Sequence, residues 1–281
     1  MSPADEDQRD PGSLRRLIAG NVELQVHCSG LGMPVVLAHG FPLEHSMWDA
    51  QIAQLSRRWR VVAPDLRGFG GSQVTLGTAT MEQMADDMAA LVDVLGIDEP
   101  IVFCGLSMGG YIALEFWRKY ASRLCGLVLC DTRAAADTPE AATARLETAL
   151  GVLRDGTAGL ADAMLSKLFA PTTLQDQSSL AAIERQTILA APPEGVAAAL
   201  RGMAARRDFR DDLAKIALPT MVIVGEHDAI STVDEMRSIA KAIPDAEFVI
   251  IPGAGHMTPL ENPDGFNEAI EQFLTRVERA G

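Results

Sequence analysis

The sequence has little positive charge and no long hydrophobic run. Lysine and arginine number 24 against 38 aspartates and glutamates, which gives a formal net charge of −14. Such an excess of negative charge repels phosphate groups, so we expect neither nucleic acid nor a membrane surface as a partner. No apolar run approaches the ~20 residues that cross a bilayer. Residues 1–10 are polar and acidic and lack the apolar segment of a signal peptide, so a cytoplasmic protein is expected.

Cysteine is also scarce, and its spacing excludes two common kinds of site. No CxxC pair occurs, and no cluster of His, Cys and Asp shows the spacing of metal ligands. We therefore predict reduced thiols in the protein core, no metal and no cofactor. The residues concerned are Cys28, Cys104, Cys125 and Cys130.

What the chain does contain is an alternation of short apolar runs with helical patterns. This alternation predicts an α/β core over residues 15–133 and 208–281, preceded by a disordered lead-in over residues 1–14. Residues 22–26 alternate apolar and polar side chains, which predicts an antiparallel strand at the sheet edge. Residues 134–207 are alanine-rich and helical without a convincing strand, and we expect them to form a cap over the carboxyl ends of the strands.

The strongest motif lies between a predicted strand, residues 101–104, and a helix that begins at Met108. Gly105-x-Ser107-x-Gly109 fits a sharp strand-to-helix turn, in which flanking side chains would collide with the elements they join. Such a turn presents the serine hydroxyl at the carboxyl end of the sheet. Because serine alone is a poor nucleophile, this interpretation requires a histidine base and an orienting acid.

Both requirements are met downstream. Asp228 follows the predicted strand at residues 220–224, and His256 follows the strand at residues 247–251. Carboxyl ends of parallel strands meet at one edge of a sheet, so we predict a catalytic triad of Ser107, Asp228 and His256. Three alternatives stay open: Asp228 caps the following helix, Glu226 supplies the acid instead, or His256 is a packing residue.

The loop His39-Gly40-Phe41-Pro42 follows another buried strand and supplies a second element of the chemistry. A tetrahedral intermediate needs N–H donors for its oxyanion, and we predict the backbone amides of Phe41 and Met108 for this role. His39 is assigned a structural role in the loop. The loop Asp65–Ser72 lacks the glycine spacing of a phosphate site, and we expect a turn braced by Asp65 and Arg67.

Apolar side chains are the candidates for a substrate pocket. The cap contributes four of them, although packing of the cap onto itself explains the same pattern, and a tryptophan precedes a predicted core helix. The candidates are Leu165, Leu168, Phe169, Ile188 and Trp48.

Over residues 20–280 the chain resembles the α/β-hydrolase superfamily. The motifs that carry the resemblance are His39-Gly40-Phe41-Pro42, Asp65–Gly70, Gly105–Gly110, Gly225–Asp228 and Gly253–His256. Within the superfamily it is similar to serine carboxylesterases and to their relatives, the 3-oxoadipate enol-lactonases, acyl-homoserine lactonases and cofactor-free perhydrolases. The resemblance implies a mostly parallel eight-stranded sheet flanked by helices, a helical cap, and the same triad and oxyanion residues.

The resemblance and the residues together predict serine-dependent hydrolysis of a small-molecule carboxylic ester through an acyl-enzyme. A lactonase with the same triad is the main alternative, followed by a perhydrolase or haloperoxidase and by a non-catalytic ligand receptor. Haloalkane dehalogenases and epoxide hydrolases share the architecture but need an aspartate nucleophile, and Ser107 departs from that. Acyl chain length and oligomeric state stay open.

Overall fold

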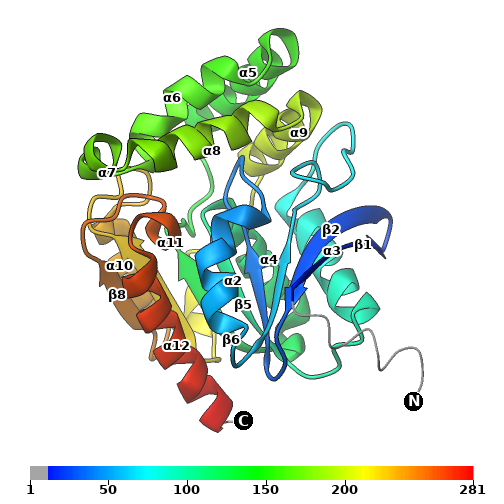
Figure 1. Ribbon diagram of the computed structural model, residues 1–281, viewed down its shortest axis with the longest axis vertical. Coiled ribbons are helices and arrows are strands. Elements are labelled where there is room, and N and C mark those ends of the chain that lie inside the picture. Colours follow the sequence, from blue (N-terminus) through cyan, green and yellow to red (C-terminus); the bar gives the residue numbers. More distant parts are fainter. Residues whose placement is uncertain (1–11, 281) are drawn as a thin grey trace.

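The computed structural model describes residues 12–280, and its framework is one eight-stranded sheet (Figure 1). The strand order across the sheet is β1-β2-β4-β3-β5-β6-β7-β8. In chain order the strands are β1 (Ser13–Ala19), β2 (Val22–Ser29), β3 (Pro34–Ala38), β4 (Arg60–Pro64), β5 (Ile101–Leu106), β6 (Leu124–Cys130), β7 (Thr220–Gly225) and β8 (Glu247–Ile251).

Pairing within the sheet is parallel from β4 to β8, while β2 pairs antiparallel with both β1 and β4. Every residue of β3, β5 and β7 is buried, which explains why these strands are continuous apolar runs rather than alternating ones. The predicted α/β class and mostly parallel sheet are confirmed. Because β5, β6, β7 and β8 are parallel neighbours, the turns after them lie along one edge.

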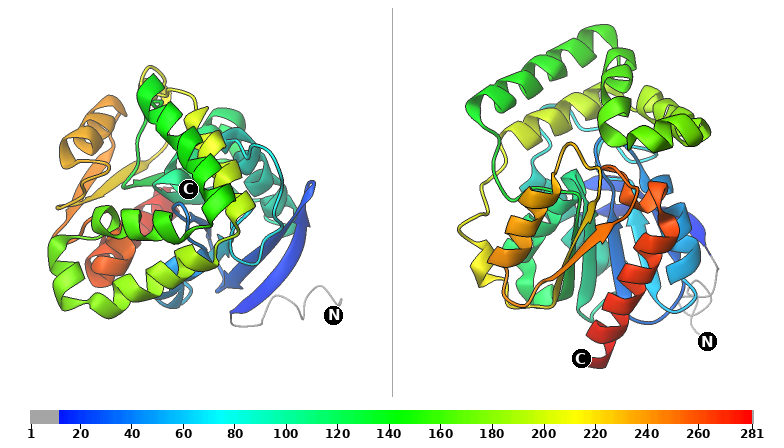
Figure 2. Two further views of the ribbon diagram at one scale, coloured as in Figure 1. Left: turned by 90° about the horizontal axis from the view of Figure 1, so that it is seen from above. Right: turned by 90° about the vertical axis from the view of Figure 1, so that its left-hand side faces the viewer.

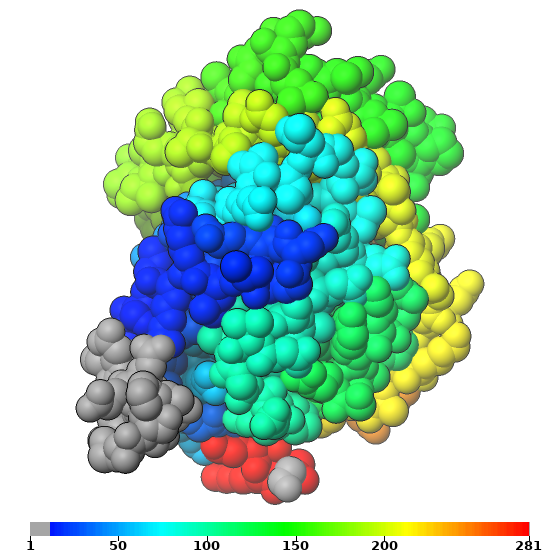
Figure 3. Space-filling model, turned by 90° about the vertical axis from the view of Figure 1, so that its right-hand side faces the viewer, coloured from blue at the N-terminus to red at the C-terminus, as the bar shows by residue number. Residues whose placement is uncertain are grey.

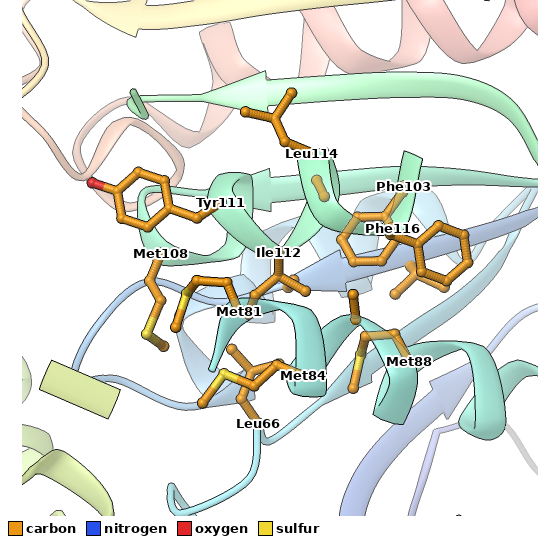
Figure 4. Close-up of a cluster of buried hydrophobic side chains, with 14 of the residues drawn as sticks. Leu66, Met81, Met84, Met88, Phe103, Met108, Tyr111, Ile112, Leu114 and Phe116 are labelled. Carbon is orange, nitrogen blue, oxygen red and sulfur yellow. The ribbon is translucent and has the colours of Figure 1, made fainter. Parts of the chain in front are cut away.

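Helices cover both faces of the sheet. Buried side chains of α3, α4 and α10 join one hydrophobic cluster, and those of α2 and α12 join a second. Figure 4 shows Met81 and Met88 of α3 near Ile112 and Phe116 of α4, with Met84 beside Leu66, so the methionine stripe belongs to the core. The helices are α2 (Asp49–Leu55), α3 (Met81–Val94), α4 (Met108–Tyr120), α10 (Val233–Ala242), α11 (Thr258–Glu261) and α12 (Pro263–Ala280).

Five helices lie between β6 and β7 and form a layer above one end of the sheet (Figure 2). We call them the cap helices: α5 (Pro139–Asp155), α6 (Ala158–Leu168), α7 (Pro171–Asp176), α8 (Ser178–Ala190) and α9 (Pro193–Ala204). Residues 131–219 are all described and contain no strand. Within residues 12–280, no helix is both long enough and apolar enough to traverse a lipid bilayer.

Three expectations are corrected at the amino-terminal side of the sheet. The lead-in predicted over residues 1–14 lies mainly outside the described residues, but Ser13 and Leu14 belong to β1. The edge strand is β1 rather than β2, because the two form a hairpin that adds one strand beyond the predicted edge. Asp65 braces the predicted turn, since its Oδ2 accepts from the amide of Gly71 at 2.8 Å, and it also bonds His45, but Arg67 pairs outside the turn with Asp87 of α3.

The cap is anchored to the core along α9. Figure 3 shows the segment after β4, in cyan, directly against α9 in yellow-green. The amide of Ala79 donates to the carbonyl of Ala198 at 3.1 Å. A Cβ atom on Gly202 would lie 1.8 Å from the carbonyl oxygen of Ala79, so only glycine permits this approach of helix and loop.

Two glycine substitutions, one in α5 and one in α9, test this close approach of α9 to the loop. A Cβ atom added to Gly151 of α5 would point into open space, so Gly151→Ala should raise the free energy of unfolding by about 0.5–1 kcal/mol through helix propensity. Gly202→Ala gains the same propensity but forces α9 off the loop, with a net loss of roughly 1–3 kcal/mol. Urea denaturation of both variants measures the difference, and equal stabilisation would contradict the close packing of α9.

Candidate active site

Ser107 occupies a strained turn between β5 and α4. Its φ is 54° and its ψ is −109°, a conformation that is costly for any residue with a side chain. The neighbouring glycines make the turn sterically feasible. A Cβ on Gly105 would lie 2.1 Å from the carbonyl oxygen of Gly109, and one on Gly109 would lie 2.2 Å from that of Ala38. The predicted glycine requirement on both sides of the serine therefore has a direct steric cause.

The turn is held to β6 by two hydrogen bonds. The Ser107 amide donates to the carbonyl of Cys130 at 2.9 Å, and the Thr132 hydroxyl donates to the carbonyl of Ser107 at 2.7 Å. A Cβ on Gly110 would come within 2.4 Å of the Thr132 hydroxyl, so the second glycine of the helix leaves room for this contact. The backbone of the serine is thus fixed independently of its side chain.

His256 and Asp228 form a buried pair. His256 Nδ1 lies 2.8 Å from Asp228 Oδ2, and the two side chains are 2% and 0% exposed. The other Asp228 oxygen, Oδ1, accepts hydrogen bonds from the amides of Ile230 (2.7 Å) and Ser231 (2.9 Å). Both oxygens of Asp228 thus have hydrogen-bond partners, and the Asp228 side chain orients the imidazole of His256.

Two of the alternatives for this pair are excluded. Glu226 is half-exposed and accepts from the amide of Gly253 at 2.9 Å, so it is not the partner of His256. Asp228 does not cap α10, because the cap of that helix is the Thr232 hydroxyl, which accepts from the amide of Glu235. The carboxyl group that bonds His256 is therefore that of Asp228.

The serine lies two parallel strands away from the acid along the same sheet edge. Among residues 12–280 no hydrogen bond joins the Ser107 hydroxyl to the imidazole of His256. The sequence Asp131-Thr132 links the two halves of the site, since Thr132 contacts Ser107 and Asp131 contacts Thr258 just after the histidine. The direct serine–histidine contact stays a prediction.

The loop after β3 passes directly beside the serine. A Cβ on Gly40 would lie 2.7 Å from the Leu106 side chain and 3.6 Å from the Ser107 Cβ. Within the described chain, no backbone hydrogen bond uses the amide of Phe41. Met108 is the first residue of α4, so its amide has no acceptor within the helix. Both amides therefore lack a backbone acceptor among residues 12–280, and their role as oxyanion donors stays a prediction.

His39 holds this loop in place. Its Nε2 accepts from the amide of Leu66 at 2.9 Å, which puts the proton on Nδ1, 2.9 Å from the carbonyl of Gly40. Complete burial lowers the pKa of His39 to about 4, so the ring is neutral at physiological pH. These contacts agree with the structural role predicted for His39.

The pocket candidates lie in one apolar cluster that spans cap and core. Trp48, Leu168, Phe169 and Ile188 are buried in it, and Leu165 packs against it while half-exposed. Trp48 also contacts the ring of Phe266 on α12, with ring centroids 5.9 Å apart. The cap residues therefore do not pack only on one another, and their role in binding substrate stays a prediction.

Glu261 is a buried residue that the sequence did not single out. Its Oε1 accepts from the amides of Gly255 (2.8 Å) and Met257 (3.1 Å), on either side of the histidine. Its Oε2 accepts from the amide of Ala170 (2.8 Å) and the hydroxyl of Thr173 (2.7 Å) in the cap. One carboxylate thus joins the histidine loop to the cap. Its only signal in the sequence is its position five residues after His256.

The histidine loop also contacts the cap through its own backbone. The amide of His256 donates to the carbonyl of Leu168 at 2.9 Å. A Cβ on Gly255 would lie 2.5 Å from the amide nitrogen of Ala170, which explains the glycine before the histidine. The position of the imidazole therefore depends on the segment between α6 and α7.

Groups that could ligate a metal are sparse. Among residues 12–280, no three or more His, Cys, Asp or Glu side chains are grouped so that they could hold a metal ion. The cysteines are free thiols, and the sulfur atoms of Cys104 and Cys130 lie 3.7 Å apart on neighbouring strands.

Comparison with known proteins assigns the family. Residues 33–263 match the family model described as the alpha/beta hydrolase fold. The chain belongs to this family. Among curated proteins it is similar to 3-oxoadipate enol-lactonase 1 of Acinetobacter baylyi, with 30% identity over 87% of this chain and 89% of that protein.

Solved structures give the same relationship. A thermophilic esterase from Thermogutta terrifontis superimposes with a TM-score of 0.92 and is 47% identical, over 95% of this chain and 99% of that one. An enol-lactonase from Burkholderia xenovorans superimposes with a TM-score of 0.87 and is 31% identical, over 93% of this chain and all of its own (100%). This α/β hydrolase therefore has both esterase and enol-lactonase relatives, as the sequence predicted, and hydrolase activity is supported.

The Glu261 contacts generate a stability prediction. Glu261→Ala removes the acceptor of four hydrogen bonds, three of them from backbone amides, and should lower the free energy of unfolding by roughly 2–4 kcal/mol. Glu271→Ala is the matched control, because Glu271 on α12 is half-exposed and bonds only Gln54, so it should change stability by about 0.5 kcal/mol or less. Chemical denaturation compares the two variants. Equal losses of unfolding free energy would contradict the role of Glu261 in joining the histidine loop to the cap.

Proposed function

We propose that the protein hydrolyses small-molecule carboxylic esters through an acyl-enzyme, with Ser107 as nucleophile, His256 as base and Asp228 as orienting acid. The observation that supports this most strongly is the buried His256–Asp228 hydrogen bond at the sheet edge that also bears the strained serine. In this proposal residues 134–207 form the cap, and residues 15–133 and 208–281 form the catalytic core.

The protonation of His256 suits it to act as the base. Its Nδ1–H donates to Asp228, which leaves Nε2 with a lone pair that can accept the hydroxyl proton of Ser107. The serine oxygen then attacks the ester carbonyl, and the imidazolium returns the proton to the departing alcohol. In the second half, His256 takes a proton from water as the water oxygen attacks the acyl carbonyl, and the imidazolium then returns the proton to the Ser107 oxygen as the carboxylic acid leaves.

The oxyanion that forms in each half is assigned to the amides of Phe41 and Met108. Removal of one such donor typically slows an enzyme ~100–1,000-fold. Backbone donors of this kind cannot be deleted by changing their own side chains. A substitution at Gly40 is expected to disturb these donors instead, because Gly40 allows the loop to lie against Ser107.

Sequence identity to solved relatives supports an acyclic ester ahead of a lactone as the substrate class. The thermophilic esterase is 47% identical to this chain, whereas the enol-lactonase structure is 31% identical. We therefore place ester hydrolysis first and enol-lactone or acyl-homoserine lactone hydrolysis second, since the same triad opens a cyclic ester. Apolar side chains of the cap, Leu165, Leu168, Phe169 and Ile188, with Trp48 from the core, are proposed to shape the acyl pocket.

The nucleophile is tested by Ser107→Ala. We expect a loss of roughly 10⁴- to 10⁶-fold in kcat/KM on short-chain p-nitrophenyl esters, because no other group supplies the attacking oxygen. Ser122→Ala, an exposed serine after α4, is the matched control and should leave turnover unchanged. Circular dichroism establishes that both variants are folded, and substantial turnover by folded Ser107→Ala would refute the mechanism.

A substrate panel separates the candidate activities. The wild-type protein is compared on p-nitrophenyl esters of increasing acyl length, on acyl-homoserine and enol lactones, and on acetate with peroxide. We expect the highest kcat/KM on an acyclic ester. A lactone as best substrate would replace the first candidate by the second, peracid formation would indicate a perhydrolase, and binding without turnover would indicate a receptor.

A further inference from the structure

A second buried aspartate lies beside the triad, and the proposed mechanism does not use it. Asp131 follows β6, is 0% exposed and has a φ of 45°, in the left-handed region that a residue with a side chain seldom adopts. A strained, buried acid at the strand end between the nucleophile and the acid–base pair requires a physical explanation.

Asp131 contacts both loops that carry the proposed acid and base. Its Oδ1 accepts from the amide of Gly225 at the end of β7 (2.9 Å), and its Oδ2 lies 2.5 Å from the hydroxyl of Thr258, two residues after His256. The charge of Asp228, three residues after Gly225, also acts on the Asp131 carboxyl group. The adjacent Thr132 contacts the nucleophile turn, so this dipeptide joins all three strand ends.

Two neighbouring buried carboxyl groups disfavour ionisation of both, because each negative charge raises the free energy of the other. The number of donors decides which group carries a proton. Asp228 accepts from three N–H groups, those of Ile230, Ser231 and His256, whereas Asp131 accepts from one N–H group, that of Gly225, and from the hydroxyl of Thr258. Burial and the charge of Asp228 raise the pKa of Asp131 well above its usual range.

We propose that Asp131 is a positioning residue: its carboxyl group is neutral, donates a hydrogen bond to Asp228, and fixes the acid and base loops relative to the nucleophile turn. As a neutral donor, it stabilises the Asp228 carboxylate without placing a second negative charge near the imidazole. The titratable groups facing it are Asp228 after β7 and Cys130 on β6, with His256 beyond Asp228. This role rests on the proposed triad.

The first test compares Asp131→Ala with Asp131→Asn. Asp131→Ala removes the donor, and we expect kcat to fall roughly 10- to 100-fold through misplacement of the base, with KM changed less than about threefold. Asp131→Asn supplies an N–H donor and a carbonyl acceptor in the same shape, and should rescue most of that loss. An unchanged kcat in Asp131→Ala, or no rescue in Asp131→Asn, would overturn the proposal.

The pH profile tests the charge of Asp131. The acid limb of kcat/KM reports protonation of the base in the free enzyme. If Asp131 is neutral, Asp131→Asn leaves this limb where the wild-type protein has it. If Asp131 is ionised, the variant removes a negative charge near His256 and the limb moves to lower pH, which would refute a neutral Asp131.

Asp87→Asn is the control for stability alone. Asp87 of α3 is also buried, but it pairs with Arg67 and, in the described part of the chain, makes no contact with the triad. It should lower the melting temperature while kcat stays that of the wild-type protein. A fall in kcat matching that of Asp131→Ala would show that loss of stability, rather than misplacement, explains the effect.

Infrared spectroscopy tests the proton directly and does not depend on turnover. The difference spectrum of wild-type protein minus Asp131→Asn should contain the carbonyl band of a protonated carboxylic acid at neutral pH, and its absence would overturn the proposal. Failure of the proposed function has a separate signature, since turnover by Ser107→Ala would refute the triad while leaving this band in place.

Discussion

The hydrogen bond between His256 and Asp228 is buried, and its burial constrains the surrounding structure. A carboxylate removed from water must be compensated by donors, or it becomes protonated and no longer holds the imidazole. The amides of Ile230 and Ser231 meet that need from the same loop, and Asp131 lies beside the pair. The turns after β6, β7 and β8 therefore have to meet, and the parallel order of these strands makes it possible.

Close approach of backbone segments is the second condition for this arrangement. A Cβ on Gly225 would lie 1.9 Å from the carbonyl oxygen of Gly255, so the loops bearing the acid and the base touch through their main chains. The nucleophile turn uses the same device at Gly105 and Gly109. Because glycine has no side chain to keep these backbone segments apart, they lie in direct contact, and hydrogen bonds then hold them in place. A site built in this way has little freedom to adjust when a methyl group is added.

The fold and the pairing of Asp228 with His256 could be predicted because both depend on local patterns. Apolar runs mark the parallel strands, and polar residues directly after them must meet at one edge. Long-range partners left no such pattern, which is why the bonds of Asp65 to His45 and of Glu261 to the cap were not foreseen. Strand β1 was partly missed because alternating half-exposed residues near a terminus resemble an irregular segment until the hairpin partner is known.

The contacts of the histidine loop with the cap have a consequence for substitutions in the cap. Three hydrogen bonds join residues 168–173 of the cap to the core, one from the His256 amide to the carbonyl of Leu168 and two from Ala170 and Thr173 to Glu261. A change that displaced these residues would break the bonds and shift the histidine loop. In the proposed mechanism the orientation of the general base therefore depends on a region of the chain that lies outside the sheet.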